Sequence, residues 1–301
     1  MTAPSYVSLK DFAEGFGDDH DALPAWVHPD ATTPVLFEQL GLRYRVEDVL
    51  DTVVALQRAE RLQDGVYAGP GAMASVYRDV LHASRTLHIA VPPAILAGTG
   101  LKAQGCFGTD GRAFLYLSTF FFDPASEGER LYMAGRLCGH IAARQVTANT
   151  IYSLLVDHNG LRQIARRGVG PVLDVVLAPM SLGVRLALSR WHRAAEITAD
   201  RAGMLVCRDV EAAATALMRQ SLGKRPDLDV ATYLEQRRVN GASPGRWTEL
   251  LNGSPWTHKR MRAMELFAGS ALYAKLTGAT VEDPLELDEL NRKTTKLLGV
   301  S

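Results

Sequence analysis

The chain has 301 residues, of which 47% are hydrophobic and 22% charged, and its formal net charge is zero. This composition is typical of a globular protein with a sizeable core, and it excludes a general attraction to nucleic acid or anionic membranes. The three cysteines are odd in number and lack CxxC spacing, which indicates free thiols in a reducing compartment.

The first residues, to position 31, are acidic and rich in turn-forming residues. We expect them to form a loosely packed N-terminal extension. The first twenty positions contain Lys10 and several acidic residues but no apolar segment of the kind found in secretory signals. We therefore expect a cytoplasmic location.

Residues 34–61 carry apolar side chains at helical spacing, and residues 73–86 have the same character, so both predict helices. Residues 92–96 and 112–122 predict strands, the second rich in aromatic residues and followed by an Asp-Pro break. We expect these strands to form a small sheet beside the next helix.

Two later stretches carry residues that are suited to a metal site. Residues 129–145 read ERLYMAGRLCGHIAARQ, and residues 191–209 read WHRAAEITADRAGMLVCRD. They resemble the paired zinc-site motifs of the gluzincin metallopeptidases of the CAAX-prenyl-protease and HtpX type, in which a His-Glu-x-x-His helix faces a Glu-x-x-x-Asp helix. The resemblance covers roughly residues 34–267. It implies an α+β, mainly α-helical, zincin-like fold with a small sheet beside the motif helix.

The flanking residues set the register of the first motif. Gly139 and its neighbours match the family pattern when His140 is taken as the second histidine. In that register Arg136 stands at the first ligand position, and Leu137 stands at the position of the general base. In the other register His140 is the first histidine and Arg144 takes the second ligand position. The flanks favour the former.

These replacements remove most of the chemistry that the family uses. A zinc peptidase of this type needs two imidazoles one helical turn apart and a glutamate that polarises the metal-bound water. Arginine cannot ligate a metal, and leucine cannot accept a proton. By the resemblance, the remaining metal-site positions are His140, Glu196 as the third ligand, and Asp200 in support of the ligand shell. Two protein ligands are fewer than catalytic zinc sites use, so we expect neither a cofactor nor catalytic residues.

His192 offers an alternative ligand, because it precedes Glu196 by one helical turn. Together with His140, this set would make an active zinc metalloendopeptidase with unorthodox ligands. Otherwise His192 lies a turn away from the site and forms hydrogen bonds at the surface. Cys138 points off the face that carries His140, so its expected role is that of a small buried thiol.

The position of Arg136 predicts that its guanidinium takes the place of the metal ion. If the two helices meet as in the family, its guanidinium faces Glu196 and Asp200 and can hold the helices together by a bidentate ion pair. In the alternative, Arg136 reaches solvent through the open cleft.

The most apolar stretch between the motifs, residues 175–184, is shorter than the roughly 20 residues that cross a bilayer. We therefore expect soluble helices there and no transmembrane segment. Residues 210–223 and 230–239 predict further helices. Residues 257–263 resemble a late family segment, which implies that His258 lies in the wall of the site or at a helix start. Residues 271–301 are expected to form a C-terminal tail whose charged blocks are solvated helix faces, or alternatively a partner-binding tail.

We thus expect a metallopeptidase-like domain over residues 32–270, a pseudopeptidase that binds a protein or peptide, associates with an active relative, or docks on a membrane surface. In the family an edge strand pairs with extended substrates through backbone hydrogen bonds, which need no zinc. Here residues 104–108 read QGCFG where relatives carry Asn-Ala-x-x-x-Gly. The alternatives are an active peptidase and a purely structural subunit with a filled cleft.

Overall fold

The fold is described from a computed structural model, which describes residues 23–32, 54–55, 58–59, 61–98, 104–156, 182–223, 229–239, 255 and 257–299. Within these ranges the chain is mainly α-helical and contains a four-stranded β-sheet. This confirms the α+β class predicted from the sequence. The helix predicted for residues 34–61 falls almost entirely outside the described ranges.

The sheet is mixed, with the strand order β1-β2-β4-β3. β2 and β4 run parallel in its centre, while β1 and β3 pair antiparallel with them at the two edges. The strands are Gly65–Tyr67 (β1), Ala94–Ala97 (β2), Gly105–Thr109 (β3) and Arg112–Ser118 (β4). The two predicted strands are therefore the central ones, and both edge strands were missed.

The aromatic run after β4 is helical, so the strand prediction for residues 112–122 is wrong at its end. β4 stops at Ser118, and Thr119–Phe122 form a short helix, α5. Phe121 and Phe122 both enter the same core cluster, whereas Phe120 is 60% exposed. Consecutive residues of a strand point to opposite faces, so two neighbouring buried rings in one cluster require a helical turn.

The sheet is buried on both faces. Leu96, Leu115 and Leu117 belong to the main core, which includes residues of the helices on that side. Phe114 and Tyr116 belong to a smaller cluster on the opposite face. This double burial explains the nearly continuous apolar sequence of β4, because a strand with one solvated face would alternate with polar residues.

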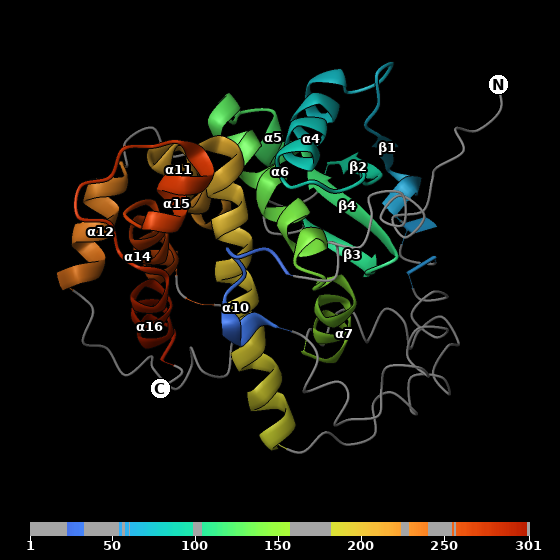
Figure 1. The fold of residues 1–301 in the computed structure, drawn as a ribbon. Helices are drawn as coiled ribbons and strands as arrows, with labels where there is room; N and C mark the ends of the chain where they lie inside the picture. The colour runs from blue at the N-terminus through green and yellow to red at the C-terminus, as the bar shows by residue number, and fades with distance from the viewer. Residues whose placement is uncertain are drawn as a thin grey trace.

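Two long helices run through the middle of the molecule (Figure 1). α6 lies beside the sheet, next to α4, and α10 packs on α6. The later helices lie on the side of α10 away from the sheet (Figure 1). The helices are α4 (Ala74–Thr86), α6 (Glu127–Ala142), α7 (Val146–Val156), α10 (Leu182–Cys207), α11 (Val210–Leu222), α12 (Val230–Val239), α14 (Thr257–Ala268), α15 (Ala271–Thr277) and α16 (Leu287–Leu297). No helix in the described ranges is long and apolar enough to cross a membrane.

The start of α6 is fixed by a capping box. The Ser126 hydroxyl accepts from the Glu129 backbone N–H at 3.4 Å, and the Glu129 carboxylate accepts from the Ser126 backbone N–H at 2.6 Å. Glu129 also receives the Arg219 guanidinium, with Nε at 2.7 Å from Oε1 and Nη2 at 3.1 Å from Oε2. This pair ties α11 to the first turn of α6 and sets the rotation of α6 about its axis.

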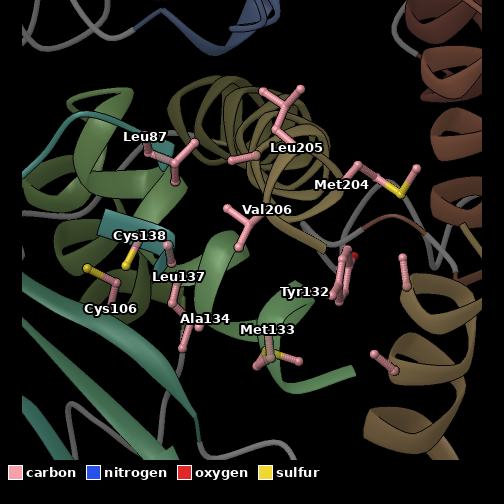
Figure 2. Close-up of a cluster of buried hydrophobic side chains, with 14 of the residues drawn as sticks. Leu87, Cys106, Tyr132, Met133, Ala134, Leu137, Cys138, Met204, Leu205 and Val206 are labelled. Atoms are coloured by element: carbon pink, nitrogen blue, oxygen red, sulfur yellow. The ribbon is translucent and has the colours of Figure 1, made fainter. Parts of the chain in front are cut away.

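α6 and α10 approach closely because glycines face the partner helix. A Cβ atom on Gly135 would come within 2.7 Å of Val206, and one on Gly203 within 2.7 Å of the Tyr132 ring. Figure 2 shows Val206 of α10 above α6, beside the buried residues Tyr132 and Leu137. The close contact brings polar side chains on the same two helices within hydrogen-bonding range.

The end of the expected N-terminal extension is packed, contrary to the loose arm predicted from its composition. Trp26 and Val27 are buried, and so are His28 and Ala31. The His28 backbone N–H donates to the Thr198 hydroxyl at 3.1 Å. The composition gave no sign of this, because the acidic and turn residues of the region surround a few apolar anchors.

The C-terminal region is also part of the body of the molecule, where a charged tail was expected. Leu290 and Thr294 of α16 are buried. Arg201 of α10 donates to the Asn291 amide oxygen from both Nη atoms, at 3.1 and 3.0 Å, and to the Trp26 carbonyl at 3.2 Å. A single buried arginine therefore holds segments from both ends of the described chain.

Candidate functional site

The residues of the two motifs meet between α6 and α10. On α6, Arg136 and His140 are separated by one helical turn, and on α10 the same spacing separates Glu196 and Asp200. All four side chains are buried. The structure therefore brings together the four remnant metal-site positions that the sequence singled out.

Arg136 bridges the two carboxylates. Its Nη2 group donates to Glu196 Oε2, and its Nε group donates to Asp200 Oδ1 at 3.2 Å. The pairing expected between Arg136 and these carboxylates is present, and the alternative in which Arg136 reaches solvent is not observed. The geometry differs from a bidentate pair with one carboxylate, because each carboxylate receives a different nitrogen.

A second arginine enters the cluster from α14. Arg260 donates to Asp200 from Nε at 2.8 Å and from Nη2 at 2.5 Å, and its Nη1 group lies 3.5 Å from Glu196 Oε2. The sequence interpretation missed it and instead singled out His258 from the same stretch. A signal was present: Arg260 shares a helical face with the apolar residues Met264 and Phe267, where a charged side chain needs a buried partner.

Tyr132 completes the cluster, one turn before Arg136 on α6. Its hydroxyl donates to Asp200 Oδ1 at 2.7 Å. Burial, followed by the neighbouring Asp200 charge, raises the pKa of Tyr132 well above its usual value, so the phenol stays protonated. Asp200 thus accepts hydrogen bonds from Tyr132 and from both arginines.

The two arginines control the ionisation of the cluster. Burial raises the pKa of Glu196, but Arg136, Arg260 and two nearby histidines outweigh it and hold that pKa well below its usual value. Burial lowers the pKa of Arg260, and the charges of Asp200 and Glu196 more than reverse this. Two cations therefore balance two anions.

His140 is neutral at pH 7. Burial lowers its pKa to about 4, with Glu196 opposing this shift and Arg136 adding to it. Its Nδ1 atom lies 3.0 Å from Gln145 Oε1 and 2.9 Å from Asn149 Nδ2. Its Nε2 atom lies 3.8 Å from Glu196 Oε1, beyond hydrogen-bonding distance.

Leu137 and Cys138 lie outside the cluster, whereas His192 is near enough to lower the pKa values of His140 and Glu196. Leu137, at the general-base position, is 1% exposed and packs in the core, as does Cys138 (Figure 2). His192 stacks on Tyr152 of α7, with ring centroids 3.9 Å apart and an interplanar angle of 13°. His258 is the second residue of α14, which agrees with its expected place at a helix start.

The residues do not fit a zinc ion. In the described part of the chain, no three His, Cys, Asp or Glu side chains are grouped so that they could hold a metal ion. Glu196 Oε2 and both oxygens of Asp200 already accept from guanidinium groups. Among the described residues this leaves Glu196 Oε1 and His140 Nε2 as metal-ligating atoms of the cluster, fewer than the three protein ligands of catalytic zinc sites.

The edge of the sheet beside α6 is covered by α7. The Gly108 N–H of β3 donates to the Thr150 hydroxyl at 3.1 Å. The Asp110 N–H donates to the Thr147 hydroxyl at 2.9 Å, and the Asp110 carboxylate accepts from the Val146 N–H at 2.9 Å. β4 is paired on both sides, with β2 and β3. A peptide strand could pair with β3 only by displacing α7, and with β4 only by displacing a neighbouring strand such as β3.

Comparison with family models, with characterised proteins and with solved structures finds no match. The resemblance to zinc peptidases therefore rests on the motif residues and their spacing.

Proposed function

We propose that this chain is a pseudopeptidase, a non-catalytic relative of the gluzincin metallopeptidases that acts by binding a protein or peptide partner. The observation that carries the proposal is the pairing of Arg136 and Arg260 with the carboxylates of Glu196 and Asp200. By the resemblance, these carboxylates would serve a zinc ion in an active relative.

Charge balance supports this interpretation. Two guanidinium groups carry the same charge as one Zn²⁺ ion, so Glu196 and Asp200 are neutralised without a metal. Arginine does not lose its proton in proteins. A zinc ion that entered the cluster would add two positive charges to a buried site whose anions are already paired, and this is unfavourable.

The absence of a base supports it as well. The general-base position belongs to Leu137, a core residue. Glu196, the nearest carboxylate to His140, has a pKa held far below neutrality, so it is a weak proton acceptor. Peptide hydrolysis through the inherited mechanism would need both a metal and a base, and the described residues of the cluster supply neither three metal ligands nor a base.

One observation favours a second function, that of a structural subunit. Because α7 packs on β3 and its Thr150 hydroxyl accepts from the Gly108 N–H, a strand could add at this edge only by displacing α7. A partner would have to use another surface, or the chain would act through its fold as part of a fixed assembly.

The proposal is tested by peptidase assays on the purified chain with and without added zinc, against a variant that restores the family residues, Arg136→His with Leu137→Glu. We expect no hydrolysis by the natural chain in either condition and a gain of zinc binding in the variant, measured by competition with a chelator. Zinc-dependent hydrolysis by the natural chain would overturn the proposal and favour an active peptidase that uses His140, Glu196 and His192.

Native mass spectrometry of the protein isolated from its own cells distinguishes a structural subunit from a pseudopeptidase. A constant stoichiometric assembly would favour the structural subunit. A free chain that exchanges with a bound partner would favour the pseudopeptidase.

A further inference from the structure

Two cysteine side chains lie on the sheet side of α6, away from the cluster of Arg136, Glu196 and Asp200. Cys106 on β3 and Cys138 on α6 are both free and buried. Both belong to the core that α6 shares with the sheet. Figure 2 shows both side chains in the same part of the core, where α6 is in contact with β3, and Cys138 is near enough to act on the pKa of Cys106. Two neighbouring thiols on different elements are a pair whose joint chemistry differs from that of either alone.

The reduced pair is unreactive at rest. Burial raises the pKa of Cys138 to about 12, and burial together with the neighbouring Cys138 raises that of Cys106 well above its usual value. Since the thiolate is the reactive form, attack on an oxidant requires a transient opening of the contact between β3 and α6. Cys207, the third cysteine, is partly exposed and donates to the Asp209 carbonyl at 3.3 Å.

The surroundings decide which product the pair can hold. A soft monovalent metal ion bound by two thiolates would leave a net negative charge in an apolar core, which is costly. A disulfide is neutral and apolar, so the same core accommodates it. The surroundings of Cys106 and Cys138 therefore favour oxidation to a disulfide over metal binding.

We propose that Cys106 and Cys138 are a latent redox pair that closes to an intramolecular disulfide in the presence of a hydroperoxide. One sulfur attacks the peroxide O–O bond and becomes a sulfenic acid, releasing water when the oxidant is hydrogen peroxide. The second thiol then displaces the sulfenic hydroxyl, which leaves with a proton as a second water. Two thiols are oxidised to one disulfide, and one peroxide is reduced to two waters.

The bond ties β3 to α6 at a position between Arg136 and His140. The bond closes a loop from residue 106 to residue 138, which lowers the conformational entropy of the unfolded chain. In the folded chain it limits how far the sheet can separate from α6. Oxidation thereby stiffens the helix that carries half of the ion cluster.

The test treats the full-length chain under native conditions with hydrogen peroxide, blocks the remaining thiols with N-ethylmaleimide, and maps linked peptides by mass spectrometry. We expect a peptide pair joined through Cys106 and Cys138, and a melting temperature raised by roughly 5 °C that dithiothreitol reverses. The variants Cys106→Ala and Cys138→Ala should each lose both the linked peptide and the shift, while Cys207→Ala should keep them.

The peptide map of the natural chain is decisive even if a core variant fails to fold. If Cys106 and Cys138 are both recovered as free thiols while Cys207 is oxidised, the pair has only a packing role and the proposal is wrong. A disulfide that joins Cys207 to either residue would contradict it as well.

Discussion

Arg136 on α6 and Glu196 on α10 form a buried ion pair between residues that are 60 positions apart in the chain. The pair connects the two central helices beside Gly135, one of the glycines at their contact. Asp200 joins the pair through a second nitrogen of Arg136. The three groups together therefore fix how each helix is rotated about its own axis.

Replacing Arg136 by alanine should destabilise the fold strongly. The substitution leaves Glu196 with one long contact to Arg260 and removes one donor from Asp200. Breaking a buried pair from one side costs about 3–5 kcal/mol. Urea unfolding monitored by circular dichroism measures the loss, and Arg136→Lys, which keeps the charge but only one donor position, should recover part of it. A melting temperature unchanged in Arg136→Ala would sink the proposal that this side chain replaces a cation.

Two arginines on α14 provide a matched comparison. Arg260 faces the cluster, whereas Arg262 has a 61% exposed side chain and pairs with Glu265 at 2.5 Å. We expect Arg260→Ala to cost about 3–5 kcal/mol, because two hydrogen bonds to buried Asp200 are lost. Arg262→Ala should change the stability by less than about 1 kcal/mol, as exposed ion pairs contribute little. Equal effects of the two substitutions, measured by urea unfolding, would contradict the assigned roles.

The stability of the fold should fall on mild acidification. Burial lowers the pKa values of His28 and His140 to about 4 in the folded chain. The unfolded chain therefore binds protons first, so the stabilisation is complete above about pH 6.5 and is lost as the pH falls toward 4. Each histidine contributes a slope of up to about 1.4 kcal/mol per pH unit in that window.

Urea unfolding at pH 7, 5.5 and 4.5 measures this slope. His28→Asn keeps an acceptor for the Asp30 N–H, which in the natural chain donates to His28 Nδ1 at 3.2 Å. This variant should lower the slope of stability against pH by up to about 1.4 kcal/mol per pH unit, the contribution of one histidine. A stability that is constant between pH 7 and 4.5 would show that neither histidine is held neutral.

The contact between Arg201 and Asn291 should be needed for the C-terminal helix to dock. Burial lowers the pKa of Arg201 to about 10. Its guanidinium donates to neutral acceptors, and the amide oxygen of Asn291 accepts two of these hydrogen bonds. Asn291→Ala should cost about 2–4 kcal/mol, since a buried cation loses its acceptor. The neighbouring Arg292→Ala removes an exposed side chain and should be nearly neutral. Thermal melts of the two variants make the comparison, and similar melting temperatures would refute it.

Helix periodicity placed Glu196 and Asp200 on one face of their helix, because i and i+4 positions lie one turn apart. That Arg136 would face them was predicted only with the family resemblance, which implies that the two helices meet. Arg260 was not predicted, since its place depends on how α14 packs against α10, which no local pattern specifies. β3 was missed for a similar reason. Its sequence, GCFGT, has two glycines and reads as a loop, and it becomes a strand by pairing with β4.

Local composition also misled at the two ends. The acidic, turn-rich segment before residue 31 indicated a loosely packed extension, and the charged segment after residue 271 indicated a tail of solvated helix faces outside the domain. In the structure a few side chains, Trp26 and Leu290 among them, are buried in the main core. Burial of isolated anchors is a tertiary property, so an average over the segment does not report it.

The most direct test is the metal content of the full-length chain, purified without a metal-affinity tag and measured by elemental analysis beside His140→Ala and Glu196→Ala. We expect no stoichiometric zinc in any of the three, because Arg136 and Arg260 already neutralise the two carboxylates. About one zinc per chain in the natural protein, lost in both variants, would contradict the replacement of the metal by arginine.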